Sequence, residues 1–305
     1  MAPQQVDLQP ETGLAAVDVT RKYAAGGRFA FLHRGLPLFS GTILASFVVV
    51  GAIGPFFTPH DPTRVDLANN LLPPAFFPGG VWTYPLGTDQ LGRDMLSRLI
   101  GGARVSLLVA LVVVLVSGAF GTTIAMLSGY LGGRLDSFLM RLTDAALAFP
   151  FLLVAIVLAG IFGPSIQIVI LTIALVGWAS YARVIRSEVL SLKTRDFVTM
   201  ASVMGAGPAW IIRRHLLPNV TGSIVVLATL QLGRAIVSEA ALSFLGIGVR
   251  PPAPSWGGML SDSQQYLIAA WWLPTLPGLA LSLTVLSSNL MGDWLRKLND
   301  PTQRH

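Results

Sequence analysis

The chain has 305 residues, of which 53% are hydrophobic and only 12% are charged, whereas a soluble globular domain carries about 25% charged residues. This composition indicates that lipid is the main solvent of the folded chain. The net charge of +6 would suit either a nucleic acid or an anionic membrane surface, and the absence of cysteine excludes disulfides, thiolate metal sites and cysteine nucleophiles.

Six apolar segments follow a charged tail at residues 1–35, which has no apolar core of signal-peptide length and which we expect to be retained. About 20 helical residues cross a hydrocarbon core of about 30 Å. Gly163-Pro164-Ser165 divides one run that is too long for a single straight span. The predicted spans are residues 36–57, 105–131, 144–162, 166–182, 220–245 and 270–291.

The segments between the spans differ in character. Residues 58–104 are rich in proline, but in the last part, residues 93–104, apolar residues recur at helical spacing. We expect this part to form a short helix that lies in the membrane interface and anchors the loop. The other connections are residues 132–143, 163–165, 183–219 and 246–269, and residues 292–305 form a C-terminal tail.

Most of the 21 Lys and Arg residues fall on the side of the membrane that carries both termini if the chain has six spans. Loops rich in Lys and Arg stay on the cytoplasmic side. We therefore expect both tails and the connections at 132–143 and 183–219 to be cytoplasmic, and the loops at 58–104 and 246–269 to be external. This topology explains the basic balance without a nucleic-acid partner.

Small residues recur at every fourth position of the second span: Ser117, Gly121, Ala125 and Gly129. Such a stripe lets two helix backbones approach closely in a membrane, where lipid gives no hydrophobic drive for association. The pattern fits packing inside the chain and contact between subunits equally well.

The connection at residues 183–219 is the most informative about function. Its pattern predicts two short helices, the second ending near Gly205 and Gly207, with Pro208 just beyond. An exposed loop has little reason to carry large apolar side chains unless another surface covers them. Here there are several: Val198, Met200, Met204, Trp210 and Ile211. Either a partner protein covers them, or they fold back onto the helix bundle.

Two ionisable residues, Arg234 and Glu239, lie inside the fifth span. A charge within a span is costly unless it is paired or hydrated. The two residues are about 140° apart around a helix and should not pair with each other. Each could line a solute pathway, contact a partner subunit or form an ion pair with another helix. The four histidines have no metal-binding spacing.

Residues 199–218 resemble the cytoplasmic loop of binding-protein-dependent ABC importer permeases. In that family Glu-Ala-Ala is followed after three residues by Gly, and nine residues later by Ile, one further residue and Leu-Pro. The positions that match are Ala201, Gly205, Leu217 and Pro218. Three of the seven defined positions depart from the pattern: Thr199, Met200 and His215.

Two further stretches narrow the resemblance to the second, C-type permease subunit of the dipeptide and oligopeptide ABC importer family. One is LGTDQLGRD at residues 86–94. The other is EAALSFLG at residues 239–246, followed by PAPSWG at 252–257. The resemblance covers residues 36–301.

This resemblance implies an all-α membrane protein of the type I ABC importer permease fold, with six spans, a permease core at residues 100–295 and a cytoplasmic coupling helix between spans four and five. It implies a subunit in the inner or plasma membrane of a bacterium that moves dipeptides or oligopeptides. The implied partners are a homologous second permease, two ATP-binding subunits, an external binding protein and membrane lipid. ATP and Mg would bind to the ATPase subunits. This chain has no phosphate-binding loop, so we expect a non-catalytic subunit without a cofactor or metal of its own.

The resemblance also implies which residues act. Contact with the ATPase is expected of Met200, Ala201, Met204, Gly205, Gly207, Trp210 and Ile211. A pathway or partner-permease contact is expected of Arg234 and Glu239. An external gate or a contact with the binding protein is expected of Asp89, Arg93, Asp94 and Trp256.

Other functions fit parts of the sequence. A nickel-complex or glutathione permease of the same family would look similar, because the external binding protein largely selects the solute. A proton-coupled secondary transporter would need acidic residues midway through its spans, and only Glu239 approaches such a position. A membrane enzyme would need clustered His, Asp or Glu residues, and the sequence has no such cluster.

Overall fold

The computed structural model describes residues 30–299. The chain divides into two units, Met1–Leu36 and Pro37–His305, and the second forms the helix bundle. Of the predicted tails, residues 1–29 and 300–305 lie outside the described residues, whereas residues 292–299 are helical rather than a free tail.

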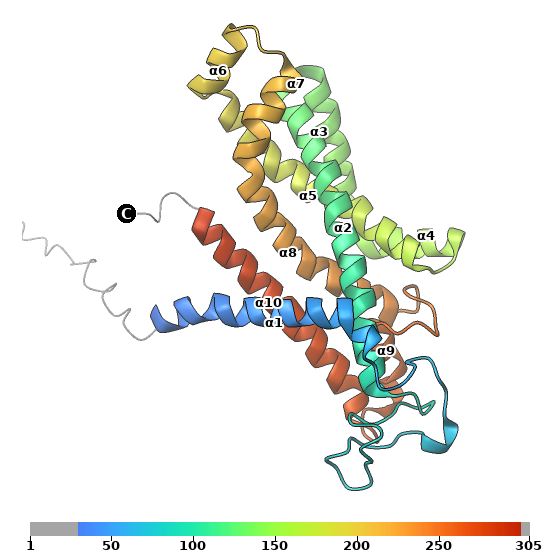
Figure 1. The fold of residues 1–305 in the computed structure, drawn as a ribbon. Coiled ribbons are helices and arrows are strands. Elements are labelled where there is room, and N and C mark those ends of the chain that lie inside the picture. Colours follow the sequence, from blue (N-terminus) through green and yellow to red (C-terminus); the bar gives the residue numbers. More distant parts are fainter. Residues whose placement is uncertain (1–29, 300–305) are drawn as a thin grey trace, which may run out of the picture. The chain divides into compact units, whose positions relative to one another are not determined.

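All regular structure in the described residues is helical, apart from a single bridge between Thr88 and Asp94. The α-helices in chain order are α1 (Ala30–Ile53), α2 (Met95–Leu131), α3 (Gly133–Ala148), α4 (Phe151–Phe162), α5 (Ile166–Lys193), α6 (Asp196–Val203), α7 (Pro208–Ile211), α8 (Leu217–Phe244), α9 (Trp256–Asp262) and α10 (Trp272–Asn299) (Figure 1). The short turns are η2 (Gly54–Phe56), η3 (Leu67–Asn69), η4 (Ile212–Leu216) and η5 (Gln264–Tyr266).

Five helical stretches in the described part of the chain are long and apolar enough to cross a membrane: Leu38–Phe56, Met95–Leu131, Ile166–Lys193, Pro208–Phe244 and Trp272–Leu298. α3 and α4 pass the same test only as a pair, and the pair is bent by 85°. The bundle therefore has five candidate spans, or six if this pair is one broken span. This result confirms the predicted all-α membrane fold.

The second span is longer than predicted. α2 runs without interruption for 37 residues, which is about 55 Å, and Asp94 caps its first turn. The prediction of a separate short helix at residues 93–104 is therefore wrong. Gly102 lies within this continuous helix, and its lack of a side chain leaves room for Trp256 of α9. A Cβ added to it would lie 2.8 Å from the Trp256 side chain.

The third predicted span, residues 144–162, is broken. Phe149 and Pro150 are extended and separate α3 from α4. Proline has no N–H to donate and disfavours the helical conformation in the residue before it, which accounts for the position of the bend. α4 has 12 residues, about 18 Å, and is too short to cross a membrane by itself. The predicted connection at 132–143 is helical as well and belongs to α3.

The predicted connection at residues 183–219 is also mostly helical. α5 continues to Lys193, and α6 ends close to its predicted end near Gly205. α7 leads through the π-helical turn η4 into α8. Pro218 in the first turn of α8 cannot donate a hydrogen bond to the preceding turn, and a local π turn is a way to accommodate this loss.

The stripe of small residues in α2 packs against α5. A Cβ added to Gly121 would lie 2.3 Å from the carbonyl oxygen of Trp178, and one added to Gly129 would lie 2.7 Å from Val189. The stripe is therefore a packing surface within the chain, which decides between the two possibilities that the sequence left open.

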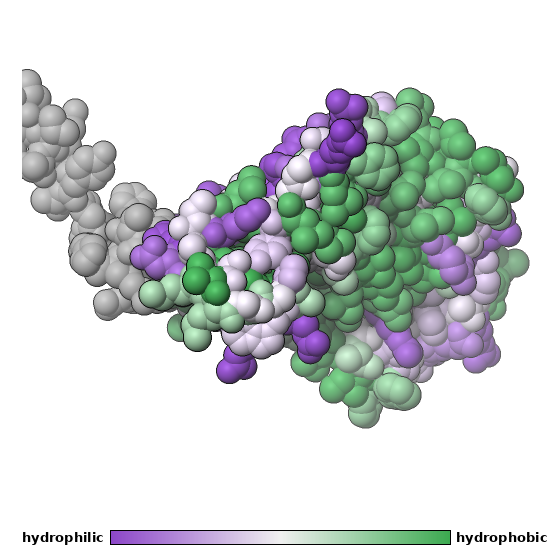
Figure 2. All heavy atoms as spheres, turned by 90° about the horizontal axis from the view of Figure 1, so that it is seen from above, coloured by the Kyte–Doolittle hydropathy of each residue, from purple (hydrophilic) through white to green (hydrophobic). Residues whose placement is uncertain are grey.

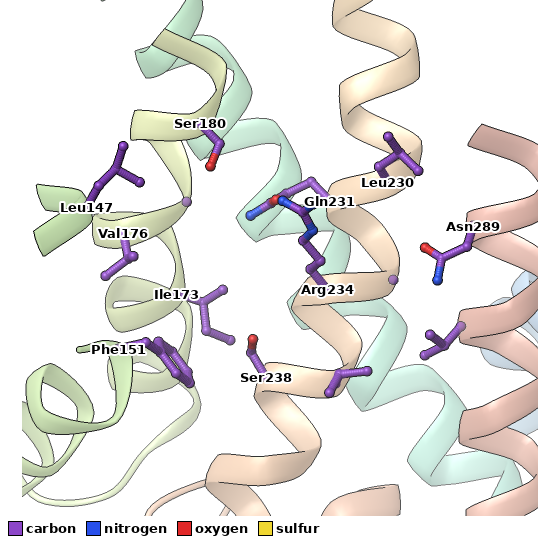
Figure 3. A pocket seen from close by; sticks show the side chains of 14 residues that line it. Leu147, Phe151, Ile173, Val176, Ser180, Leu230, Gln231, Arg234, Ser238 and Asn289 are labelled. Carbon is purple, nitrogen blue, oxygen red and sulfur yellow. The ribbon is translucent and has the colours of Figure 1, made fainter. Parts of the chain in front are cut away.

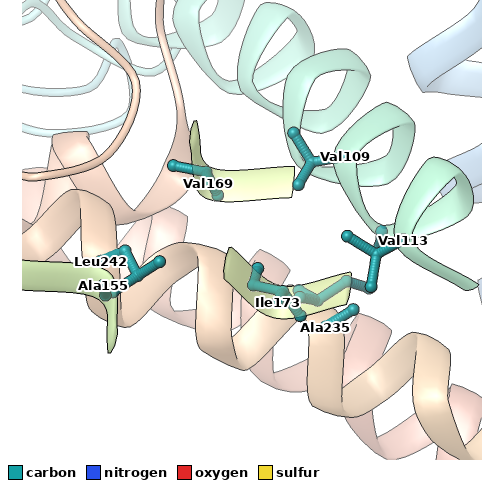
Figure 4. Packing of buried hydrophobic residues seen from close by; sticks show 9 residues of the cluster. Val109, Val113, Ala155, Val169, Ile173, Ala235 and Leu242 are labelled. Atoms are coloured by element: carbon teal, nitrogen blue, oxygen red, sulfur yellow. The ribbon is translucent and has the colours of Figure 1, made fainter. Parts of the chain in front are cut away.

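The core lies where α2, α4, α5 and α8 meet, and Figure 4 shows side chains from these helices gathered between them. Its buried members include Val109, Val113, Ala155, Val169, Ile173, Ala235 and Leu242. The outer surface is apolar too: Leu115 and Ile161 are 60% and 68% exposed. Figure 2 shows broad hydrophobic areas with hydrophilic residues in smaller groups, as expected for helices that face lipid or other membrane subunits.

The loop at residues 58–94 is held together by hydrogen bonds from polar side chains. Asp66 accepts one from the side-chain amide of Asn69 at 2.8 Å and one from the Tyr84 hydroxyl at 3.3 Å. The bond from Asn69 holds the pKa of Asp66 below its ordinary value. The Trp272 indole N–H, at the start of α10, donates to the carbonyl oxygen of Thr88 at 3.1 Å. The loop is thereby fixed to the helix bundle.

Candidate functional site

The α6–α7 segment, residues 196–211, stands at one end of the bundle (Figure 1). One side of it is anchored, since Val198 and Ile211 are only 2% and 0% exposed. They pack in a cluster with Ile185 and Val189 of α5 and with Leu216. For these two residues the interpretation that they fold back onto the bundle is correct, and Ile211 is an anchor rather than an outward contact.

The other side of the α6–α7 segment is apolar and uncovered. Met200, Met204 and Trp210 are 67%, 87% and 52% exposed. Val203, which is 83% exposed, belongs to the same surface, although it is not among the predicted contact residues. Val203 lies three residues after Met200, and residues at this spacing share one face of a helix, so the sequence could have identified it. We call these four side chains the apolar tip.

The turn between α6 and α7 has a defined shape. Gly205 has φ +86°, a backbone conformation that side-chain-bearing residues rarely adopt. The N–H groups of Gly205 and Ala206 donate to the carbonyl oxygens of Ser202 and Ala201, both at 3.0 Å, which is the Schellman arrangement at a helix C-terminus. Gly207, in contrast, is extended with φ −71° and precedes α7.

His215 stands at the position where the family pattern has Ile, and it contacts both short helices. The ring centroids of His215 and Trp210 are 5.0 Å apart, and those of His215 and Phe197 are 5.8 Å apart. The imidazole thus fills the role of an apolar packing group between α6 and α7.

A cavity of about 600 Å³ lies between α5, α8 and α10, close to the bend between α3 and α4 (Figure 3). Arg234 of α8 points into it and is the only ionisable side chain in its lining. Neither an ion pair nor a hydrogen bond is formed by this guanidinium within residues 30–299. The lining also contains Ser180, Gln231, Ser238 and Asn289.

Glu239 has a different environment from Arg234. It is fully buried between α8 and α2, where it accepts hydrogen bonds from the hydroxyls of Ser106 at 2.7 Å and Ser243 at 2.8 Å. As predicted, it does not pair with Arg234, and among the described residues it has no ion pair at all. Glu239 therefore joins two helices, whereas Arg234 faces the cavity.

A buried ionic cluster holds the start of α2. Arg93 and Arg98 approach one carboxylate oxygen of Asp89, with Nε at 2.6 Å and 3.3 Å respectively. Both guanidiniums also face Asp262 of α9, at 3.5 Å and 3.7 Å. Asp89, Arg93 and Arg98 are at most 5% exposed.

Asp94 and Trp256 complete this buried region. Asp94 accepts hydrogen bonds from the N–H and the hydroxyl of Ser97, and the Trp256 indole N–H donates to the carbonyl oxygen of Leu99 at 3.0 Å. Both residues are nearly inaccessible. This burial of Asp89, Arg93, Asp94 and Trp256 argues against direct contact with a binding protein, whereas the alternative role in an external gate stays a prediction. These side chains fix the loop to α2 and α9 instead.

Several residues of these sites were not predicted from the sequence. Arg98 and Asp262 are far apart along the chain, and no spacing rule connects them. The sequence could have identified Gln231, because it lies three residues before Arg234 and therefore on the same helix face. No sequence pattern could have identified Asn289, since only the packing of α10 against α8 brings it to the cavity.

Two family models match the chain. Residues 121–305 match the model described as binding-protein-dependent transport system inner membrane component. Residues 28–74 match the N-terminal TM domain of oligopeptide transport permease C. The first match contains the α6–α7 segment and the cavity, and the second contains the described part of α1.

Curated relatives are similar over most of their length. The chain is 44% identical over 253 residues to the dipeptide transport system permease protein DppC of Haemophilus influenzae, which is 83% of this chain and 86% of the relative. It is 37% identical over 305 residues to the protein of that name from Alkalihalophilus pseudofirmus, covering 100% and 97%. It is 36% identical over 278 residues to the probable D,D-dipeptide transport system permease protein DdpC of Escherichia coli, covering 90% and 91%.

Proposed function

Because this chain belongs to the family of binding-protein-dependent transport system inner membrane components, we propose that it is the permease subunit of an ABC importer that moves dipeptides or oligopeptides. The fold is that of a type I ABC importer permease, and the protein is a multi-pass inner membrane protein. Relatives named for dipeptide transport support the choice of solute.

The observation that carries this proposal is the apolar tip of the α6–α7 segment. Met200, Val203 and Met204 are exposed while Val198 and Ile211 anchor the same segment in the core. An anchored element with an apolar outer face is suited to bind a partner protein and to transmit the partner's movement to the helix bundle. We assign the apolar tip and Ala201 to the contact with the ATPase, and Gly205 and Gly207 to the turn that shapes it.

The proposed assembly contains a homologous second permease, two ATP-binding subunits and an external binding protein, in a surrounding of lipid. ATP and Mg bind to the ATPase subunits, and this chain is non-catalytic and holds no cofactor. With both termini cytoplasmic, the α6–α7 segment faces the ATPases and the loop at 58–94 faces the binding protein. The cavity beside Arg234 is one wall of the solute pathway, and the second permease supplies the other wall.

Reconstitution tests the proposal. The chain is produced together with its second permease and ATPase subunits, and the complex is placed in proteoliposomes with the binding protein. We expect the ATPases to copurify and radiolabelled alanylalanine to accumulate only with ATP and the binding protein. Uptake that needs no ATP and stops when a proton ionophore is added would instead show a secondary transporter.

The two related solutes are separated in the same system. A nickel complex and glutathione are offered to the purified binding protein in competition with alanylalanine. If either displaces the peptide at much lower concentration and is the solute that accumulates, the proposed peptide specificity is wrong, while the importer mechanism stands.

A further inference from the structure

The cavity between α5, α8 and α10 has a polar wall formed by five side chains: Ser180, Gln231, Arg234, Ser238 and Asn289 (Figure 3). All five can donate hydrogen bonds, and Arg234 can only donate. The remaining lining residues are apolar or glycine, and no carboxylate is among them. The wall therefore carries one formal positive charge and an excess of donors.

These donors are not used within the chain. Within the described range, residues 30–299, no hydrogen bond or ion pair is made by any of the five side chains. Gln231 is the most telling of them, since it is only 8% exposed. Its amide atoms are not fully enclosed, so a ligand in the cavity can accept a hydrogen bond from the amide N–H groups.

Two glycines leave room for the side-chain amides of Gln231 and Asn289 in the polar wall. A Cβ added to Gly177 would lie 2.8 Å from the amide nitrogen of Gln231, and one added to Gly233 would lie 3.0 Å from the amide oxygen of Asn289. Because these glycines leave room for the amides, the Gln231 amide lies close to the backbone of α5 and the Asn289 amide lies close to the backbone of α8. Both residues line the same cavity as Arg234 (Figure 3).

Building on the proposed function, we propose that this polar wall binds the C-terminal carboxylate of the transported peptide on its way through the membrane. Arg234 supplies the opposite charge, and Gln231 and Asn289 donate to the carboxylate or to the adjacent peptide carbonyl. The cavity of about 600 Å³ is large enough for a small peptide. A peptide ammonium group would be repelled by Arg234, so this wall orients the peptide with its carboxylate toward α8.

Protection of a cysteine tests this binding directly, because the chain has no cysteine of its own. Val237 lines the cavity, is 46% exposed and is not part of the polar wall. In the complete complex, with partner cysteines replaced and the binding protein omitted, Val237→Cys is labelled with N-ethylmaleimide. We expect alanylalanine to slow this labelling, and alanylalanine amide, which lacks the carboxylate, to slow it far less.

Variants at Arg234 provide a second test of the proposed carboxylate binding. In Arg234→Gln the loss of one charge-assisted contact should raise the alanylalanine concentration needed for protection by roughly tenfold, whereas Arg234→Lys should retain most of the protection. Arg141→Gln removes an arginine that is exposed and does not line this cavity, and should change nothing. Ser137→Cys, an exposed position outside it, should be labelled equally with and without peptide.

Equal protection by the acid and the amide, or protection that Arg234→Gln leaves unchanged, would overturn the carboxylate site. If Arg234→Gln instead prevents the two permeases from copurifying, Arg234 pairs with a carboxylate of the partner permease, and the inference is wrong. ATP-driven peptide uptake by the unmodified complex is measured in parallel. Its presence with charge-independent protection refutes only this inference, whereas its absence refutes the proposed function.

Discussion

Glu239 illustrates how a single residue can be misread from its charge. A carboxyl group inside a span suggests a proton carrier or a pathway contact, but the structure surrounds it with the hydroxyls of Ser106 and Ser243 and buries it completely. Its acceptor oxygens link α8 to α2. Arg234, five residues earlier on the same helix, faces the cavity instead.

Replacing Glu239 should therefore affect stability. Glu239→Leu leaves two buried hydroxyls without their acceptor and should cost about 1–3 kcal/mol, seen as a lower Tm of the purified complex. Glu239→Gln keeps one acceptor oxygen and should lose less. Proton-coupled transport would give the opposite pattern, with Glu239→Gln abolishing uptake at an unchanged Tm.

At the scale of elements, a close contact between two helices and one turn each depend on glycine. α2 and α5 approach each other through Gly121 and Gly129, and α6 is joined to α7 through Gly205. The glycines of the helix contact and the glycine of the turn are needed for two different physical reasons. Gly121 and Gly129 give space for a neighbouring helix, whereas Gly205 allows a left-handed backbone with open space around it.

The α2–α5 contact predicts that Gly121→Ala destabilises the bundle. The added Cβ would lie 2.3 Å from the Trp178 carbonyl oxygen, so backbone must shift, at a cost of about 1–3 kcal/mol. Gly160→Ala in α4 is the matched control, because nothing lies within 4 Å of its Cβ. There alanine should stabilise the helix by up to about 1 kcal/mol. Thermal unfolding of the two variants should shift Tm in opposite directions, and a common direction would contradict this account.

The turn after α6 predicts a loss of coupling in Gly205→Val. A left-handed conformation costs a side-chain-bearing residue about 1–2 kcal/mol, so the turn should change shape and displace the apolar tip. We expect normal membrane insertion and ATP hydrolysis, but strongly reduced peptide uptake in proteoliposomes. Gly160→Ala in α4 is the control, because it lies outside this turn and no atom lies within 4 Å of the added Cβ. Equal uptake by both variants would refute the role of this turn.

At the scale of the whole molecule, the number of crossings depends on α3 and α4. Five helical stretches can each cross by themselves, and the bent pair decides whether the described chain has five or six spans. An even number places both termini on the same side, which the distribution of Lys and Arg favours.

Reporter fusions should locate both termini in the cytoplasm. A fluorescent protein that folds only in the cytoplasm should be bright at either end of the chain and dark when inserted after Asn70 in the loop at 58–94. Bright fluorescence at one terminus and none at the other would mean that α3 and α4 do not cross, and the orientation of the α6–α7 segment would need revision.

The sequence by itself determined the membrane solvent, the all-α class, the family resemblance and the approximate places of five apolar helices that are long enough to cross a membrane. These follow from local composition, helical spacing and short motifs, which are properties of neighbouring residues. Even the end of α6 near Gly205 could be predicted, because helix termination is a local event.

Only the tertiary structure decided which side chains meet. It buried Asp89 with Arg93 and Arg98 and brought both arginines to Asp262 of α9, separated Glu239 from the cavity, and brought Asn289 of α10 to the same cavity as Arg234 of α8. It also showed that α2 continues through Gly102 and that Trp256 fills the space beside this glycine. The physical reason is that burial and pairing depend on contacts between residues far apart in the chain, and spacing along one helix carries no information about the helix packed against it.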